Sequence, residues 1–218
     1  MHAIVIGATG ATGQDLLDVL LQDDAVQRVD IFVRRDVNIQ HPKLLVRVID
    51  FDQPEQWGHL VKGDVLFSCL GTTLRAAESK EAQWKIDYDY QYRFARIARD
   101  NNVNKYVLVS SDFASPNARS FYPRMKGQLE EAVKALGFAH TTIFNPPLLI
   151  RKNTDRAGEV IGFKVIRLLN RLGLVRSQTP MPTVVLAQAM INSAKKNEHG
   201  IRKLRGKAIW ERARVSGK

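Results

Sequence analysis

The stretch that decides the fold is Ile4-Val5-Ile6-Gly7-Ala8-Thr9-Gly10-Ala11-Thr12-Gly13-Gln14-Asp15-Leu16-Leu17. Its apolar beginning has the length of a β-strand, and the leucines near its end begin an amphipathic helical pattern. Between the two lie glycines spaced Gly-x-x-Gly-x-x-Gly. The stretch therefore predicts a strand, a tight turn and a helix at the start of the chain.

This glycine-rich turn has the chemistry of a phosphate cradle. Glycine permits positive φ and lets a ligand approach the backbone without a Cβ in the way. The helix that follows offers unpaired N–H donors and the positive end of its dipole to a pyrophosphate. The simpler alternative is a tight strand–helix turn without a ligand. We predict a cofactor-binding segment that consists of Gly7, Ala8, Thr9, Gly10, Ala11, Thr12 and Gly13.

The next predicted strand, Val29–Val33, indicates the type of cofactor. In a dinucleotide-binding βαβ unit, an acidic residue at the end of this strand binds the free 2′-hydroxyl of the adenosine ribose. This chain has Arg34 and Arg35 there instead. Guanidinium groups bind phosphate through paired hydrogen bonds, so the arginines favour a 2′-phosphate and hence NADP. NAD stays as a minority alternative, because Asp36 comes next.

Further strands are predicted at Leu44–Ile49 and Asp64–Cys69, and a long helix from Trp84 to Asp100. The carboxyl ends of parallel strands meet at one edge of a sheet, where ligands bind. The residues that follow these strands are therefore candidate cofactor contacts: Asp50 and Phe51 near the adenine, and Leu70, Gly71 and Thr72 near the ribose and pyrophosphate. The basic stretch Arg75–Lys85 is expected to be a mobile loop.

A candidate catalytic group follows the predicted strand Lys105–Val109. The strand ends in Ser110 and Ser111, and a Tyr-x-x-x-Lys motif formed by Tyr122 and Lys126 opens the next predicted helix. Helical spacing of four places the tyrosine and the lysine on the same side. The ammonium then stabilises the phenolate form of the tyrosine, and a serine hydroxyl can hold a carbonyl oxygen.

The ordered set Gly-Ala-Thr-Gly-Ala-Thr-Gly, Val-Arg-Arg, Cys-Leu-Gly-Thr-Thr, Val-Ser-Ser and Tyr-x-x-x-Lys-Gly resembles the atypical short-chain dehydrogenase/reductases, in particular their NADPH-binding, oxidoreductase-like branch. The resemblance implies that Tyr122 donates the proton and that Lys126 tunes it and holds the nicotinamide ribose. Ser110 or Ser111 would orient the substrate. The family often has Arg-Pro-Gly where this chain has Asn145-Pro146-Pro147, and Asn145 and Pro146 are the expected contacts there.

Composition is that of one soluble α/β domain. The chain has 218 residues, 44% of them hydrophobic, and contains no apolar run long enough for a transmembrane helix. No signal peptide is expected from its N-terminus. Cys69 is the only cysteine, which fits a reducing compartment, so we expect a cytoplasmic protein. The histidines lack metal-ligand spacing, and no metal site is predicted.

The last part of the chain, residues 151–218, is predicted to be a small basic lobe that does not form an independent domain. The excess of positive charge, +11 for the whole chain, lies in it. Without aromatic residues among the cations or a nucleic-acid motif, we interpret it as a solvated face, with attraction of a phosphate ligand as the alternative, and predict no specific nucleic-acid site. Its predicted elements are two helices, Gly158–Arg171 and Val184–Lys196, and a last short strand, Lys207–Trp210.

The sequence thus predicts a Rossmann-like, doubly wound parallel sheet with helices on both faces and NADP(H) at the carboxyl ends of the strands. Two functions are compatible with it. The first is an NADP(H)-dependent oxidoreductase that reduces a small carbonyl or quinone-like compound by hydride transfer. The alternative is an NADPH-binding regulatory or sensor protein without robust catalysis. The substrate and the oligomeric state are not encoded in a readable pattern.

Overall fold

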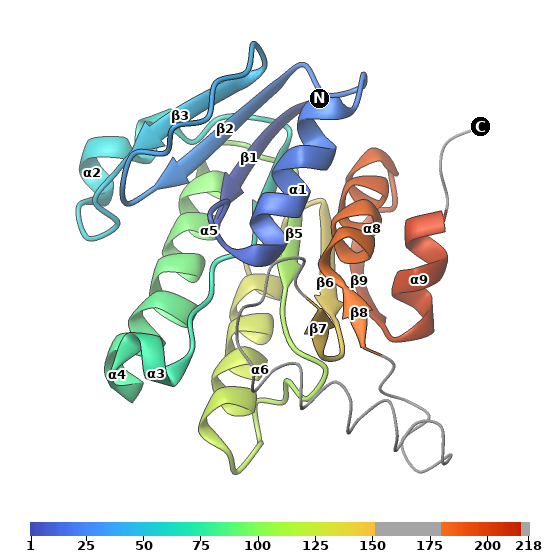
Figure 1. The fold of residues 1–218 in the computed structure, drawn as a ribbon. Coiled ribbons are helices and arrows are strands. Elements are labelled where there is room, and N and C mark those ends of the chain that lie inside the picture. Colours follow the sequence, from blue (N-terminus) through green and yellow to red (C-terminus); the bar gives the residue numbers. More distant parts are fainter. Residues whose placement is uncertain (151–179, 215–218) are drawn as a thin grey trace.

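The computed structural model describes residues 1–150 and 180–214. Its centre is a seven-stranded parallel sheet in the order β3-β2-β1-β4-β5-β6-β9 (Figure 1). The strands are β1 (His2–Ile6), β2 (Arg28–Val33), β3 (Leu44–Val48), β4 (Val65–Ser68), β5 (Lys105–Val109), β6 (His140–Asn145) and β9 (Gly200–Arg205). A separate pair joins β7 (Leu149–Ile150) to β8 (Met181–Pro182). The predicted Rossmann-like sheet is confirmed.

Helices cover both faces of this sheet. The helices are α1 (Ala11–Gln22), α2 (Pro54–Trp57), α3 (Leu74–Ala77), α4 (Lys80–Trp84), α5 (Tyr90–Asp100), α6 (Phe121–Lys134), α8 (Thr183–Lys195) and α9 (Lys207–Arg214). A 3₁₀ turn spans Gly58–Leu60 and a π-helical turn spans Lys85–Asp89. Helices α1, α8 and α9 share one hydrophobic core with the sheet, and α5 and α6 share another.

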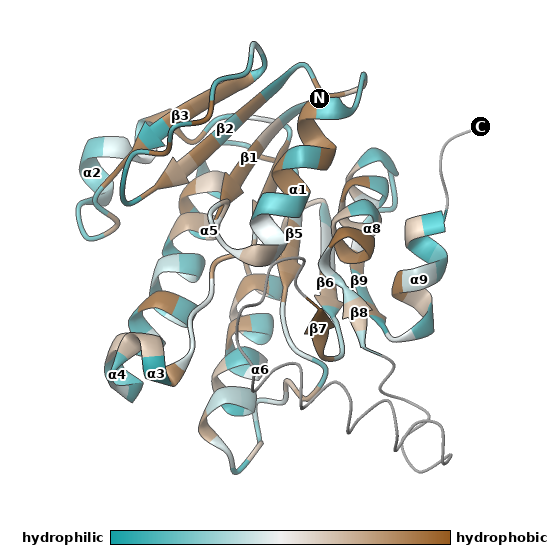
Figure 2. Cartoon of the chain, viewed as in Figure 1, coloured by the Kyte–Doolittle hydropathy of each residue, from teal (hydrophilic) through white to brown (hydrophobic). Residues whose placement is uncertain are grey.

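Strand β1 shows how one sheet serves two cores. Successive side chains of a strand point to opposite faces. Ala3 and Val5 therefore pack with α1 and α8, whereas Ile4 and Ile6 pack with α5 and α6, and all are fully buried. Parallel strands buried on both faces are apolar along their whole length, and Figure 2 shows this hydrophobic colour on β1.

The junction of β1 and α1 requires glycine at two positions. Gly7 has a φ of +79°, and a Cβ on it would lie 2.4 Å from the carbonyl carbon of Cys69, after β4. A Cβ on Gly13 would lie 2.0 Å from the oxygen of Gly7. The two glycines thus let α1 pack directly on the turn, and the turn pack on the end of β4.

The stretch predicted as a loop at Arg75–Lys85 is largely helical, so that expectation was wrong. Thr73 accepts the N–H of Ala76 at 3.2 Å, and Ser79 accepts the N–H of Ala82 at 3.0 Å. These side chains cap the starts of α3 and α4. The helix predicted from Trp84 to Asp100 is present but is interrupted by the π-helical turn.

Residues 180–214 belong to the same sheet and helix layers as the rest of the described chain. The seventh strand is β9, and it pairs with β6. The strand predicted at Lys207–Trp210 was wrong, because these residues begin α9 and Ile209 packs into the core shared with α8. The predicted helix Val184–Lys196 corresponds to α8. The predicted helix Gly158–Arg171 lies outside the described residues.

A buried carboxylate ties the first three strands together. Asp30 of β2 is 1% exposed and accepts hydrogen bonds from His2 Nε2 at 2.9 Å, Arg28 Nε at 2.6 Å and Arg47 Nε at 2.9 Å. Burial alone raises the pKa of Asp30, but the hydrogen bonds from these three residues outweigh it and hold the pKa well below its ordinary value. The ionised carboxylate therefore stabilises the contact between β1, β2 and β3.

Gly13→Ala should destabilise the fold, because the added methyl group would clash with the Gly7 carbonyl. We expect the free energy of unfolding to fall by about 1–3 kcal/mol or more. Gly58→Ala is the control, since its Cβ would meet only the Ile97 side chain at 3.5 Å, and it should change stability by less than ~1 kcal/mol. Urea unfolding followed by circular dichroism measures both. Equal losses would contradict the packing argument.

Asp30→Asn should cost about 3 kcal/mol at neutral pH, because it removes the charge that its cationic partners compensate. The exposed Asp24→Asn is the control. Since the folded pKa of Asp30 is depressed, its contribution is present above its ordinary pKa of ~3.9 and is lost as the pH falls through the folded value. Urea unfolding at several pH values should show the difference from wild type shrinking below about pH 4. A difference independent of pH would refute this role.

Candidate functional site

The carboxyl ends of β1 and β4 form the switch point of the sheet. From β1 the strand order continues to β2 and β3, and from β4 it continues in the opposite direction to β5, β6 and β9. Ligands of open α/β sheets bind in the crevice outside the strand ends at this point. The segments that follow β1 and β4 meet there, since Cys69 donates its backbone N–H to Ile6 O at 2.9 Å.

Helix α1 begins at this edge, and no side chain caps its first turn. The N–H of Gly10 donates to Gly7 O at 3.0 Å. The next N–H groups, of residues 11–13, have no acceptor within the helix. Thr9 and Gly10 are exposed. The predicted segment Gly7–Gly13 therefore has the open donors that an anion needs at a helix N-terminus, and its missing Cβ atoms fit a pyrophosphate lying against the backbone.

Three of the four predicted adenosine-side residues line one cavity of about 370 Å³. Arg34, Val48, Ile49, Asp50, Phe51 and Tyr90 line it. Arg34 is exposed and makes no ion pair with any residue in the described part of the chain. Its guanidinium is therefore available to a ligand phosphate. Arg35 is also exposed but is not among the lining residues.

Asp50 and Phe51 also have structural roles in this loop. The Asp50 carboxylate accepts the N–H of Asp52 at 2.9 Å. The Phe51 ring is 4% exposed and packs against Trp57 and Tyr90, so most of it belongs to the core. Buried aromatic rings, those of Phe51 and Tyr90, thus form one wall of the cavity, and the exposed side chains of Asp50 and Arg34 lie at its rim.

After β4 the predicted segment Leu70–Thr72 is fixed by a buried acid. Thr72 donates its N–H to Asp87 Oδ1 at 2.7 Å, and its carbonyl accepts the Gln83 side-chain amide at 3.1 Å. Gly71 is exposed and keeps this turn clear of side chains. Burial raises the pKa of the neighbouring Cys69 thiol to about 12. That thiol is therefore not a nucleophile at neutral pH.

Tyr122 and Lys126 lie together on the first turns of α6, as their spacing predicts. Lys126 Nζ is 5.9 Å from the centroid of the Tyr122 ring. The Tyr122 side chain is 39% exposed, whereas Lys126 is 3% exposed. The Lys126 ammonium faces Asp87 Oδ2 at 4.0 Å. A buried ammonium thus lies below a phenol that solvent or a ligand can reach, which suits proton donation from the phenol.

The two predicted serines differ in availability. The Ser110 hydroxyl is buried and donates to Glu130 Oε1 at 2.5 Å. Ser111 is only partly buried, and its side chain has no hydrogen bond to the described residues. Ser111 is therefore the serine that remains open to a substrate. The sequence left both serines as candidates.

Asn145 ends β6 at the same edge, Pro146 follows it, and both are buried. Asn145 Nδ2 donates to Ser111 O and to Glu130 Oε1, both at 2.6 Å. Because both partners are acceptors, the amide nitrogen must face them. The side chain holds together the ends of β5 and β6 and the helix α6.

Sequence reasoning missed two acids that organise this site. Asp87 connects the Thr72 loop to Lys126. The Glu130 carboxylate accepts hydrogen bonds from Ser110, Asn145 and Lys203, and Lys203 Nζ lies 2.5 Å from Glu130 Oε2. Helical spacing of four after Lys126 could have pointed to Glu130. No local signal marks Asp87, because the π-helical turn decides which way it faces.

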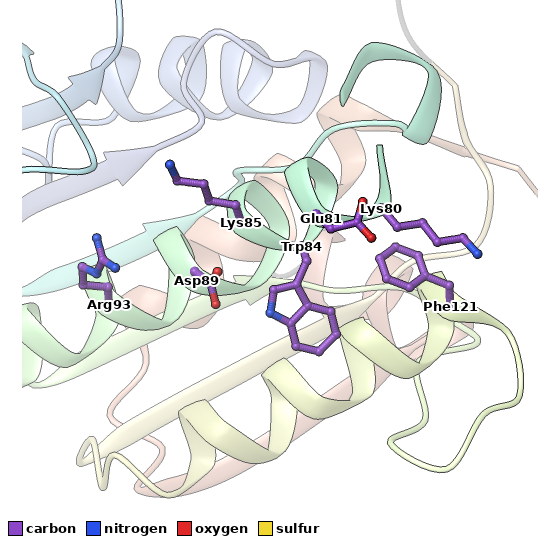
Figure 3. A pocket seen from close by; sticks show the side chains of 7 residues that line it. All are labelled: Lys80, Glu81, Trp84, Lys85, Asp89, Arg93 and Phe121. Atoms are coloured by element: carbon purple, nitrogen blue, oxygen red, sulfur yellow. The ribbon is translucent and has the colours of Figure 1, made fainter. Parts of the chain in front are cut away.

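A second cavity, of about 620 Å³, lies between α4, the π-helical turn, α5 and the start of α6 (Figure 3). Its lining residues are Lys80, Glu81, Trp84, Lys85, Asp89, Arg93 and Phe121. None of the predicted site residues lines it. The Lys85 ammonium is already paired with Asp52 at 2.8 Å.

Two further observations concern the described residues only. Within 1–150 and 180–214, no group of three or more histidine, cysteine or acidic side chains could hold a metal ion. No helix in these ranges is long and apolar enough to cross a membrane.

Relatives with similar sequences occur in fungi. "Protein fmp52, mitochondrial" of Emericella nidulans is 30% identical over 96% of this chain and 94% of its own length. "Protein fmp52-2, mitochondrial" of Aspergillus terreus is 31% identical over 91% of this chain and 88% of its own. The expectation of a cytoplasmic protein was wrong, because these relatives are named as mitochondrial. A single cysteine and the start of the chain carry too little information to identify a compartment.

Solved structures share the fold at low sequence identity. A short-chain dehydrogenase/reductase superfamily protein from Agrobacterium tumefaciens, with bound NAD, superposes with a TM-score of 0.72 at 12% identity over 94% of this chain and 77% of that one. The oxidoreductase ylbE from Lactococcus lactis gives 0.67 at 16% identity over 98% and 95%. At these identities the likeness establishes the fold alone.

The family model described as NAD(P)H-binding matches residues 7–161, from the first glycine of the cradle to beyond β7. That range contains the predicted cofactor segments and the Tyr122–Lys126 pair. The particular roles of these residues stay predictions, as does the choice between NADP and NAD. The chain belongs to the NAD(P)H-binding family, which confirms its resemblance to the atypical short-chain dehydrogenase/reductases and a nicotinamide cofactor.

Proposed function

We propose that this protein is an NADP(H)-dependent oxidoreductase that reduces a small carbonyl or quinone-like compound. The observation that carries the proposal is the Tyr122–Lys126 pair, in which an accessible phenol lies over a buried ammonium. The pair stands on α6 beside the strand ends where a nicotinamide cofactor binds in this fold. The names of the fungal relatives support a mitochondrial setting for this activity.

The cofactor would be held at two places. The open N–H groups at the start of α1 would bind the pyrophosphate, and the exposed Gly10 would let it approach the backbone closely. Arg34 would bind a 2′-phosphate at the cavity next to Asp50. The Agrobacterium protein holds NAD. What favours NADP here is the Arg34 guanidinium, which has no ion pair with the described residues and stands where an acid would bind a free 2′-hydroxyl.

The chemistry divides between the cofactor and the chain. A reduced nicotinamide, when bound, supplies a hydride to the carbonyl carbon. The Tyr122 hydroxyl would give its proton to the carbonyl oxygen, so that the product is an alcohol. The Lys126 ammonium would stabilise the phenolate left behind, and the Ser111 hydroxyl would hold the carbonyl oxygen before transfer.

A second candidate is an NADPH-binding regulatory or sensor protein without robust catalysis. The observation that favours it is the hydrogen bond from the Ser110 hydroxyl to Glu130, which leaves only one of the two candidate serines available to a substrate. Asp112 also stands directly after Ser111, so a carboxylate lies near the place proposed for a carbonyl oxygen. This candidate predicts tight cofactor binding with no turnover on any substrate of a carbonyl and quinone panel.

The chain should bind NADPH more tightly than NADH. A charged hydrogen bond to phosphate contributes about 1.5–3 kcal/mol, so Arg34→Ala should weaken NADPH binding roughly tenfold or more and leave NADH nearly unchanged. Arg35→Ala should weaken NADPH binding too if both arginines contact the phosphate. Arg96→Ala, an exposed arginine of α5, is the matched control. Fluorescence titration with both cofactors measures this, and equal wild-type affinities would refute NADP preference.

Tyr122→Phe should remove the proton donor while keeping the ring that stacks on Lys126. We expect NADPH oxidation with a carbonyl substrate to fall by roughly 10²–10⁴-fold, with cofactor affinity changed little. Tyr88→Phe, which removes a hydroxyl from the π-helical turn packed against α6, should leave the rate unchanged. Steady-state assays with the substrate panel measure both variants. A Tyr122→Phe enzyme as fast as wild type would exclude Tyr122 as the acid.

A further inference from the structure

Asp87 is a buried acid that the proposed chemistry leaves without a role. It lies on the π-helical turn between α4 and α5 and is 0% exposed. Its two oxygens face different segments of the site. Oδ1 accepts the Thr72 N–H at 2.7 Å, and Oδ2 lies 4.0 Å from Lys126 Nζ.

The π-helical turn is what brings this side chain inward. One extra residue in a helix turn shifts every following side chain around the axis, and such turns are frequent at functional sites. The widened turn is held in place, because Gln91 Nε2 donates to the Asp87 carbonyl at 2.7 Å. Gln91 Oε1 in turn accepts the Ser68 hydroxyl of β4 at 2.7 Å. The position of Asp87 is therefore fixed against the sheet.

The pairing between Asp87 and Lys126 is incomplete. Asp87 Oδ2 is buried and has no hydrogen-bond partner among residues 1–150 and 180–214, and 4.0 Å is beyond hydrogen-bond distance. Burial raises the pKa of Asp87, while the Lys126 ammonium and the Thr72 N–H act in the opposite direction. In the described residues, Asp87 is also the one acid that faces the Lys126 ammonium. A buried ammonium needs such a counter-charge.

We propose that Asp87 is the positioning residue for Lys126: its carboxylate holds the ammonium beside Tyr122 and, through Thr72, holds the loop after β4 in register with α6. The inference rests on the proposed function, because Lys126 is the predicted contact of the nicotinamide ribose and that loop is the predicted contact of the ribose and pyrophosphate. Asp87 itself touches neither phenol nor substrate. It acts through Lys126.

Asp87→Asn tests this, because it keeps an oxygen for the Thr72 N–H and removes the charge that faces Lys126. Fluorescence titration should show NADPH binding weakened about tenfold. In a Lys126→Met background the same change should weaken binding by less than about twofold, since residues that act as a unit are not additive. Asp89→Asn is the matched control. It lies on the same turn but lines the cavity of Figure 3, and it should bind within about twofold of wild type.

Asp87→Glu is the conservative variant and keeps the charge. It should bind NADPH more tightly than Asp87→Asn, which a purely space-filling role would not require. If Asp87→Asn proves too unstable to titrate, Asp87→Glu is compared with Lys126→Met, and equally weak binding would overturn the proposal. Full additivity of Asp87→Asn and Lys126→Met would also overturn it. A wild-type chain that binds no dinucleotide would instead refute the proposed function.

Discussion

The Cα of Gly13 lies against the carbonyl of Gly7, so closely that a Cβ there would stand 2.0 Å from its oxygen. This contact fixes how α1 leaves β1. It also fixes the direction in which the first N–H groups of the helix point, toward the carboxyl edge of the sheet. Gly7 in turn lies against the backbone after β4. The geometry of the whole candidate site thus depends on two missing side chains.

Buried carboxylates at the two ends of the sheet differ in how fully they are hydrogen-bonded. Near the start of β2, the Asp30 carboxylate has three hydrogen-bonded partners, His2, Arg28 and Arg47, all within 2.9 Å. At the carboxyl edge, Asp87 Oδ2 and Lys126 face each other without a hydrogen bond. Fully satisfied charges stabilise a fold, whereas incompletely satisfied buried ones are typical of sites that receive a ligand.

The sequence was sufficient for the fold because its signals are local. Apolar runs of strand length, each followed by helical periodicity, specify a parallel sheet, and the glycine spacing specifies the first turn. The Tyr122–Lys126 pair could also be foreseen, since helix geometry alone brings the two together. Short helices within polar stretches were missed because two side-chain caps decide them, those of Thr73 and Ser79.

Other features of the site depend on contacts between distant segments. The hydrogen bond from Ser110 to Glu130 is an example, because it requires β5 and α6 to be already in place. Lys203 reaches the same carboxylate from β9, at the far end of the chain. The inward direction of Asp87 depends on a π-helical turn, for which the sequence contains no established pattern.

Strand β9 has a consequence for solubility. Among the residues that the structure describes, it is the last strand in the sheet order, and an outermost strand presents unpaired backbone groups that can template the addition of another chain. Its exposed residues include Arg202, Lys203 and Arg205. Lys203 is paired with Glu130, but the strand contains no acidic residue, so two copies that approached edge to edge along β9 would still bring its arginines together. Electrostatic repulsion therefore protects this border of the sheet against aggregation by strand addition.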